Sequence, residues 1–269
     1  MNELLLGIVS DEVSSDFADS LRHARMWGIR RFEIRCLKSG RVPDVDQAEW
    51  EQVVRLSTEA AVQITALSPG IFKYPLSKTT EIERELTEVL PKTIEMAKTV
   101  NAGMVIAFGF CREPGEPPEF RDRAVDFLRR AAAIVERSRM RLAIENEPGF
   151  WCDTGTNTMA IMREVNSKAL GVNWDPCNAF GTTELPYPDG YNAVRDAVFN
   201  VHVKDTKRGS LIECVPVGDG VIDWKGQIEA LIRDRIVEHV TIETHCHPLV
   251  ENSARNVAAV NQLIKGAHR

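Results

Sequence analysis

The sequence lacks the features that mark membrane proteins and nucleic-acid-binding proteins. Among its 269 residues, no apolar run approaches the roughly 18 residues that a membrane-spanning helix needs, so no membrane partner is expected. An excess of basic residues is also missing, because the formal net charge is −6, which argues against a general nucleic-acid binder. We therefore expect a small-molecule partner.

Signals for export and for disulfide bonding are missing too. The N-terminus holds an acidic residue, Glu3, and a short apolar run, without the basic region of a signal peptide. The six cysteines are scattered along the chain and include no C-x-x-C pair. In a chain without a leader, this pattern indicates reduced thiols and a cytoplasmic protein.

What the chain does contain is a regular alternation of strand-like and helix-like segments. Apolar runs of strand length occur near residues 4–9, 31–35, 62–67, 103–108, 141–145, 170–174, 198–203 and 239–243. Apolar residues at helical spacing follow them, at 17–27, 47–60, 80–99, 119–137, 157–166, 189–197, 225–234 and 252–265. Eight such units in a chain of this length predict an α/β fold, a single (β/α)8 TIM barrel that spans residues 1–269.

A doubly wound open sheet is the alternative fold. It usually carries a glycine-rich phosphate loop directly after its first strand. Here the first strand leads into Ser10-Asp11-Glu12-Val13-Ser14-Ser15, which contains no glycine. No Ser/Gly-rich linker divides the chain into two domains either. These observations favour the closed barrel.

The last four predicted strands each end in a side chain that can bind a metal ion. They are Glu145, Asp175, His202 and Glu243. Consecutive strand ends are neighbours at the top of a barrel, where such folds place their chemistry. Buried carboxylates also repel each other unless a cation compensates them. The pattern predicts one divalent metal ion; Mn²⁺, Mg²⁺ and Co²⁺ suit these ligands best, and Zn²⁺ is also compatible.

Short motifs surround these four residues. They are Ile144-Glu145-Asn146, Asn173-Trp174-Asp175, Val201-His202-Val203-Lys204-Asp205, Val217-Gly218-Asp219-Gly220-Val221-Ile222-Asp223-Trp224 and Ile242-Glu243. Together they resemble the xylose isomerase-like barrel superfamily, the group of sugar and sugar phosphate isomerases, sugar epimerases and the AP endonuclease family 2 type domain. The resemblance extends over essentially the whole chain.

The resemblance implies roles for individual residues. It implies that Glu145, Asp175, His202 and Glu243 are the metal ligands. In the ketose 3-epimerase branch the two glutamates also move protons, and an arginine six positions after the histidine binds substrate, which corresponds to Arg208. A cation chelated by a hydroxyl and a carbonyl acidifies the C–H bond between them, because it stabilises the resulting enediolate. Glu145 and Glu243 are the candidate acid and base.

The chain departs from two branches of the superfamily. Endonuclease IV-type enzymes use three metals held by additional histidines, but the third strand here ends in Ser68-Pro69 and the fourth in Phe108-Gly109-Phe110. Asn178 stands where that branch, and the ketose 3-epimerases, have a histidine. Trp151 replaces the second substrate-binding glutamate of the epimerases. These departures exclude the three-metal nuclease and weaken the match to a 3-epimerase.

Further polar side chains near the predicted strand ends are candidates for substrate binding. They are Lys204, Arg208, Asn178, Glu147 and His245. Alternation along the seventh strand puts Lys204 on the same face as His202. Glu33 and Arg35 end the second strand and are expected to pair with each other. Phe72 and Trp151 lie on loops and either cover a substrate or pack those loops.

Three hypotheses follow for the function. The leading one is a divalent-metal-dependent isomerase or epimerase of a sugar or sugar phosphate. The second is a metal-dependent dehydratase of a cyclic keto-polyol or keto acid, such as an inosose or dehydroshikimate, because the same enolate can expel a β-hydroxyl. The third, ranked last, is a non-catalytic metabolite-binding barrel. Exposed helix faces leave room for a homo-oligomer, and the sequence does not specify one.

Overall fold

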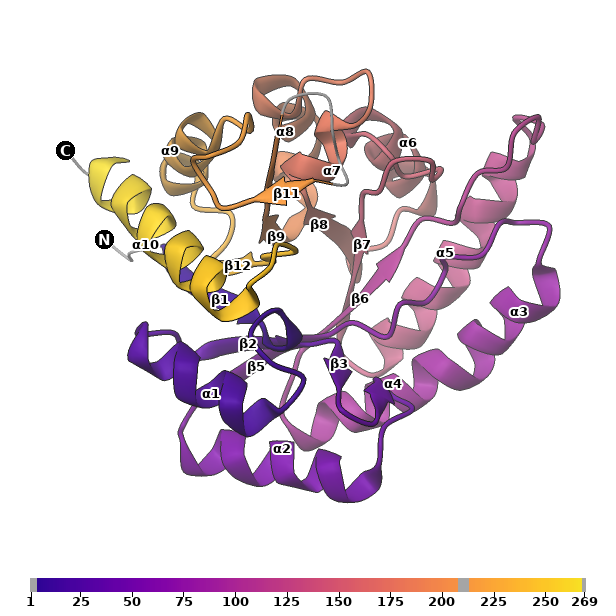
Figure 1. Cartoon of the computed structure of the whole chain (residues 1–269). Helices are drawn as coiled ribbons and strands as arrows, with labels where there is room; N and C mark the ends of the chain where they lie inside the picture. The colour runs from indigo at the N-terminus through magenta and orange to yellow at the C-terminus, as the bar shows by residue number, and fades with distance from the viewer. Residues whose placement is uncertain (1–3, 208–212, 268–269) are drawn as a thin grey trace.

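The protein is a closed eight-stranded barrel with helices around its outside (Figure 1). The structure, a computed structural model, describes residues 4–207 and 213–267. The barrel strands are β1 (Leu5–Val9), β2 (Arg31–Ile34), β5 (Gln63–Leu67), β6 (Met104–Phe108), β7 (Arg141–Glu145), β8 (Leu170–Trp174), β9 (Val198–Val203) and β12 (His239–Ile242). All neighbouring pairs are parallel, and the ring closes where β1 pairs with β12. The predicted (β/α)8 barrel is confirmed.

The helices pack their apolar sides against the strands. They are α1 (Phe17–Met26), α2 (Gln47–Glu59), α3 (Thr79–Arg84), α4 (Leu90–Thr99), α5 (Phe120–Arg137), α6 (Gly155–Val165), α7 (Pro176–Phe180), α8 (Tyr191–Val194), α9 (Trp224–Asp234) and α10 (Leu249–Ala267). In α5, for example, Ala124, Leu128, Ala131 and Val135 recur at helical spacing and are buried. In the described ranges, no helix has the length and apolar character to cross a membrane.

Two of the predicted helices are interrupted. A single π-helical turn, η2 (Glu85–Val89), joins α3 to α4 within the segment predicted as one helix over 80–99. The segment 189–197 holds the end of a second π-helical turn, η3 (Pro186–Gly190), then α8, then a 3-10 turn, η4 (Arg195–Ala197). Pro186 and Pro188 lie just before this segment, where proline cannot donate the backbone hydrogen bonds of a longer helix.

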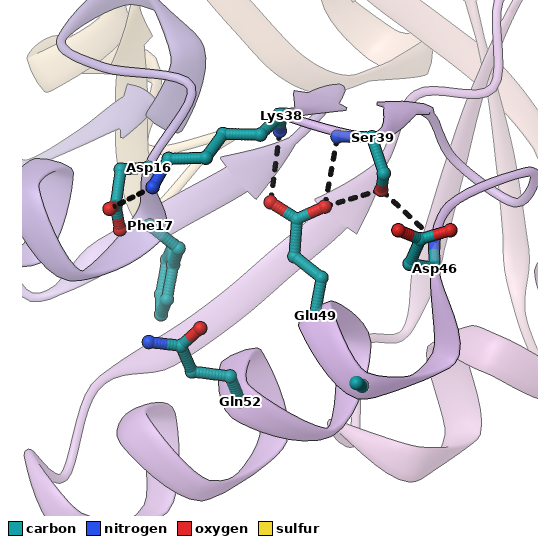
Figure 2. A pocket seen from close by; sticks show the side chains of 8 residues that line it. Asp16, Phe17, Lys38, Ser39, Asp46, Glu49 and Gln52 are labelled. Atoms are coloured by element: carbon teal, nitrogen blue, oxygen red, sulfur yellow. Dashed lines mark hydrogen bonds and ion pairs between the residues drawn. The ribbon is translucent and has the colours of Figure 1, made fainter.

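Two short hairpins, which the sequence pattern did not predict, lie on the loops after β2 and β9. The first joins β3 (Cys36–Leu37) to β4 (Gly40–Arg41), and the second joins β10 (Asp205–Thr206) to β11 (Cys214–Val215). Figure 2 shows how the first hairpin is anchored to the helices beside it. Glu49 of α2 accepts hydrogen bonds from the backbone N–H groups of Lys38 (2.9 Å) and Ser39 (3.0 Å), and the Lys38 ammonium pairs with Asp16 before α1.

The inside of the barrel has an apolar layer and a polar layer. Ala66, Met104, Ile106 and Ala143 form a small cluster separate from the main core, with Phe199 packed against it. Phe199 fits there because Gly171 has no side chain, since a Cβ at that position would lie 2.5 Å from its ring. Above them, Asn173 accepts a hydrogen bond from Asn200 (3.0 Å), which accepts one from Thr241 (3.1 Å). This polar layer supports the strand ends.

A buried carboxylate holds the loop after β5. The Phe72 N–H donates a 2.7 Å hydrogen bond to Glu85 of η2, and Phe72 has a left-handed backbone with φ of 64°. Glu85 is 6% exposed, and burial raises its pKa to about 7, from 4.5 for an unperturbed glutamate. The folded protein therefore keeps a proton on Glu85 that the unfolded chain releases at lower pH.

We expect the contribution of Glu85 to stability to fall as pH rises. Between pH of about 4.5 and about 7 the unfolded chain binds fewer protons than the folded protein, so wild-type stability decreases through this window. Glu85→Gln cannot ionise, so its stability relative to the wild type should increase by roughly 2–3 kcal/mol between pH 5 and pH 8. Urea unfolding at both pH values measures the difference. Glu88→Gln, an exposed neighbour on the same turn, is the control, and an equal gain there would contradict the explanation.

Candidate metal centre

The strand ends place the four predicted ligands on one side of the barrel. Glu145 is the last residue of β7, and His202 lies near the end of β9, opposite Thr241 of β12. Asp175 and Glu243 come directly after β8 and β12. Asp175 also begins α7, since its side chain accepts a 3.0 Å hydrogen bond from the Asn178 N–H. Each side chain is thus attached to a rigid element.

These four side chains converge. Each offers one ligand atom, and the four atoms all lie within 4.8 Å of one another. Nδ1 of His202 is 3.4 Å from Glu243 and 3.6 Å from Glu145. All four residues are buried, with at most 4% of their surface exposed. The geometry brings together the complete set that the sequence predicted as ligands.

Glu33 orients the histidine of this cluster. Its carboxylate, at 1% exposure, is 2.9 Å from Nε2 of His202, so the imidazole can donate through Nε2 and present Nδ1 to the other three residues. A carboxylate on the far nitrogen is the usual partner of a metal-binding histidine. The expected pairing of Glu33 with Arg35 is wrong, because Glu33 contacts His202 while Arg35 pairs with three other carboxylates.

Asparagine side chains hold the Asp175 backbone and the Glu145 carboxylate. Asn146 accepts from the Asp175 N–H (2.8 Å) and donates to the Asp175 carbonyl (2.9 Å). Asn173 donates to Glu145 (3.2 Å), and Asn178 donates to the other oxygen of Glu145 (3.3 Å) and to the Asn146 carbonyl. The two hydrogen bonds to Glu145 favour its ionised carboxylate. Asn146 and Asn173 flank the predicted ligands in the sequence, but nothing in the pattern distinguished them as supports.

The charges of the cluster are strongly coupled. Burial opposes ionisation of Glu243, yet Lys204 and His202 hold the pKa of its carboxyl well below the usual range. Burial also opposes ionisation of Glu145, and His202 lowers the pKa of its carboxyl. Burial raises the pKa of Asp175. Burial also disfavours the charged imidazole of His202, but Glu33 and Glu145 raise its pKa well above normal. Three acids thus depend on nearby cations.

One oxygen of the cluster depends on a neighbouring cation. Oδ2 of Asp175 is fully buried, and the Lys204 ammonium lies 2.7 Å from it. Lys204 therefore compensates the charge of this carboxylate. The three-carboxylate, one-imidazole donor set fits a divalent metal ion.

The predicted substrate-binding residues have different surroundings. The Lys204 ammonium bridges Asp175 and Glu243, at 2.7 and 2.9 Å, as its alternation with His202 implied. The His245 ring is 3.0 Å from Glu243 and lines the same cavity, although it belongs to a loop. Asn178 and Glu147 line this cavity as well, and Glu147 pairs with Lys73 (3.1 Å). Arg208 lies outside the described residues.

Arg35 adds a second charge network beside the cluster. Its guanidinium contacts Asp11 (2.9 Å), Glu12 (2.5 Å) and Glu243 (2.9 Å), so it joins the loop after β1 to the loop after β12. The ring closure of the barrel makes these loops neighbours. Sequence reasoning missed this role, because Asp11, Glu12 and Glu243 are distant from Arg35 in the chain.

A cavity of about 430 Å³ lies over these residues. Its wall includes Glu145, His202, Lys204 and Glu243. The volume suits a small metabolite.

Phe72 is fully buried and Trp151 is 7% exposed, so both pack their loops rather than lie free above the cavity. Trp151 donates a 3.1 Å hydrogen bond to Glu116, which further fixes its ring.

The comparison with protein families agrees with this fold. The sequence model of the family described as "Xylose isomerase-like TIM barrel" matches residues 21–265. The chain belongs to this family. Among curated protein sequences, none matches the chain.

Several solved structures share the whole fold at low sequence identity. The probable 3-DHS dehydratase AsbF from Bacillus anthracis has a TM-score of 0.81 at 15% identity, covering 96% of this chain and 99% of that one. L-ribulose 3-epimerase has a TM-score of 0.79 at 15% identity, covering 100% and 96%. The IOLI protein with a bound zinc atom has a TM-score of 0.79 at 17% identity, covering 98% of each chain. At these identities the likeness concerns the fold.

Replacing Glu33 is expected to weaken metal binding without removing a ligand. Glu33→Gln leaves His202 without its ionised partner, and losses of this kind lower metal affinity about 10- to 100-fold. Calorimetric titration of chelator-stripped protein with Mn²⁺ measures the effect. Glu147→Gln is the matched control, because Glu147 lines the same cavity but pairs with Lys73 instead of a predicted ligand. Equal affinities for both variants would show that Glu33 does not act through His202.

Proposed function

We propose that this protein is a divalent-metal-dependent isomerase or epimerase of a small polyol ketone, a sugar or a sugar phosphate. The observation that carries the proposal is the convergence of Glu145, Asp175, His202 and Glu243 within 4.8 Å of one another, buried beside a cavity of about 430 Å³. These four residues would hold one ion, with Mn²⁺, Mg²⁺ or Co²⁺ preferred and Zn²⁺ compatible.

The proposed reaction needs a group that stabilises negative charge and two side chains that transfer protons. A divalent ion bound to these residues would stabilise the negative charge that develops when the C–H bond beside a ketone is broken. Glu145 and Glu243 come from different strands, β7 and the loop after β12, and both are favoured in the ionised form by nearby cations. One removes a proton from the substrate and the other returns it.

The position of the returned proton decides the product. Delivery to the opposite face of the same carbon gives an epimer, and delivery to the neighbouring carbon gives an isomer. The Lys204 ammonium and the His245 ring both contact Glu243, at 2.9 and 3.0 Å, and can donate hydrogen bonds to substrate hydroxyl or carbonyl oxygens near that carboxylate. The fold shared with L-ribulose 3-epimerase supports this class of reaction.

A metal-dependent dehydratase is the second candidate, and His245 favours it. Loss of a β-hydroxyl requires a proton donor at the leaving oxygen. Burial opposes the charged form of His245, but Glu243 raises the pKa of its imidazole, which keeps a proton available there. The fold shared with the probable 3-DHS dehydratase is consistent with this reaction. A conjugated enone absorbance without epimer formation would identify the dehydratase.

A screen for exchange of substrate protons with deuterated solvent tests the proposal. The protein is loaded with Mn²⁺ and incubated with ketoses, inososes and keto acids, and deuterium incorporation is measured by mass spectrometry. Metal-dependent incorporation is expected for at least one class, and it reports the step that both candidate reactions share. A protein that binds no divalent ion would refute the proposal. Tight ligand binding without exchange would instead support a non-catalytic metabolite-binding barrel.

A further inference from the structure

One cation in the wall of the cavity differs from the others. Arg35 has three carboxylate partners, Lys204 has Asp175 and Glu243, and Lys73 has Glu147. His245 contacts Glu12 and Glu243. Arg41 also lines the cavity, but within residues 4–207 and 213–267 no carboxylate forms an ion pair with it. In the described part of the wall, Arg41 is therefore a guanidinium whose charge has no direct carboxylate partner.

Arg41 is held in place by neutral groups. Its Nε donates to the Ser68 carbonyl (3.0 Å) and its Nη2 donates to the Ser68 hydroxyl (3.2 Å). The guanidinium lies against Gly70, whose φ is 74°, and a Cβ at that position would be 2.7 Å from Cζ and Nε of Arg41. A glycine therefore makes the space for this side chain. Of its five N–H groups, those not used by Ser68 are available to a ligand.

The backbone that carries Arg41 is fixed as well. Arg41 belongs to β4 of the first hairpin, and the hairpin turn is bound to α2 through Glu49 and to the start of α1 through Asp16 (Figure 2). Ser39 accepts a further 2.9 Å hydrogen bond from the Asp46 N–H. Burial and the charge of Arg35 lower the pKa of Arg41, so the charged form is held there at a cost. An anionic ligand would repay that cost.

We propose that Arg41 binds a carboxylate of the substrate, so that the substrate is an acidic polyol ketone rather than a neutral sugar. This inference rests on the proposed function, since it assigns the substrate class of the same site. Guanidinium and carboxylate form paired hydrogen bonds of matching geometry. The Ser68 hydroxyl, which accepts from Arg41 and is 2% exposed, can donate its own hydrogen to the same anion.

The charge balance favours a carboxylate over a phosphate. Among the described residues of the wall, the other cations already have carboxylate partners, and Arg41 supplies one positive charge for the ligand. A carboxylate carries one negative charge and matches it. A phosphate monoester carries nearly two at neutral pH, and would need a second unpaired cation.

The test compares three ligands that differ at one carbon. D-Fructose, D-fructuronate and D-fructose 6-phosphate carry a hydroxymethyl, a carboxylate and a phosphate group at C6, and share the same ketone end. Calorimetric titration of the Mg²⁺-loaded protein measures their binding without requiring turnover. We expect the wild type to bind D-fructuronate at least about tenfold more tightly than D-fructose, and more tightly than the phosphate.

Variants assign the preference to Arg41. Arg41→Gln should lower the affinity for D-fructuronate about 10- to 100-fold and change that for D-fructose less than about threefold. Arg41→Lys should recover part of the loss, because it restores the charge but not the fork geometry. Arg55→Gln, which removes an exposed arginine of α2, is the matched control for net charge. Ser68→Ala provides a second variant, with a smaller loss expected, and thermal unfolding verifies that each variant is folded.

Three outcomes would overturn the assignment. They are equal or weaker binding of D-fructuronate relative to D-fructose, an equal loss of both ligands in Arg41→Gln, and tighter Arg41-dependent binding of the phosphate than of the carboxylate. Metal content and proton exchange are measured on the same preparations. A protein that binds Mg²⁺ and exchanges protons but prefers neutral ketoses would refute only the role of Arg41. One that binds no divalent ion would refute the proposed function.

Discussion

The Glu243→Gln variant is expected to exchange substrate protons with solvent at least about 10³-fold more slowly than the wild type. The amide cannot accept a proton, and the change also removes one negative charge from the predicted metal ligands. Lys204 and His245, which both contact Glu243, would lose their ionised partner.

Two measurements separate proton transfer from metal binding. Exchange is followed at several Mn²⁺ concentrations, and the metal content of the variant is determined at each. Loss of exchange with a full complement of metal indicates the proton-transfer role, whereas recovery at high Mn²⁺ indicates a role in affinity only. Glu147→Gln, in the same cavity, is expected to change the rate less than about tenfold. Comparable losses in both variants would argue against a specific role for Glu243.

The strands and the four converging side chains could be predicted from the sequence for a simple physical reason. Each strand is a short apolar run, and each candidate ligand lies near, at or just beyond the end of its own strand. In a parallel barrel, adjacent strand ends meet on one side. Local patterns and a general rule of the fold were therefore sufficient to bring together Glu145, Asp175, His202 and Glu243.

The partners of those side chains could not be predicted in the same way. Glu12 and His245 are 233 residues apart, and they meet only because β1 pairs with β12. The expectation that Glu33 would pair with Arg35 was local, and the fold directs these side chains to His202 and to three distant carboxylates instead. Arg41 lies on a hairpin of two-residue strands, which are too short to produce a recognisable pattern.

The loops above the barrel illustrate the same limit. Phe72 and Trp151 were equally consistent with covering a substrate and with packing their loops. The deciding contacts come from Glu85, which binds the Phe72 N–H, and from Glu116, which binds the Trp151 ring. Both partners belong to segments whose position depends on the complete fold. Side chains on loops are thus harder to assign than side chains at strand ends.

Replacing Arg35 is expected to have the largest effect on stability. Arg35→Met removes the guanidinium that Asp11, Glu12 and Glu243 share, and leaves carboxylates of 12%, 3% and 5% side-chain exposure without that cation. Burial opposes the charge of Arg35, yet these carboxylates raise its pKa well above normal. They therefore strongly favour the charged guanidinium. Removing one partner of a buried ion pair typically costs about 3–5 kcal/mol.

Urea unfolding of metal-free protein measures this cost, since a bound cation would replace part of the lost charge. Arg22→Met is the matched control, because Arg22 pairs with Asp19 on the exposed side of α1, and its replacement should cost less than about 1 kcal/mol.

A double variant tests the cause. If the penalty arises from uncompensated carboxylates, adding Glu12→Gln to Arg35→Met removes one of them. The double variant should then be at least about 1 kcal/mol more stable than the sum of the two single changes implies. Strict additivity would mean that Arg35 stabilises the barrel through packing of its aliphatic stem, and that the charge network between the loops after β1 and β12 contributes little.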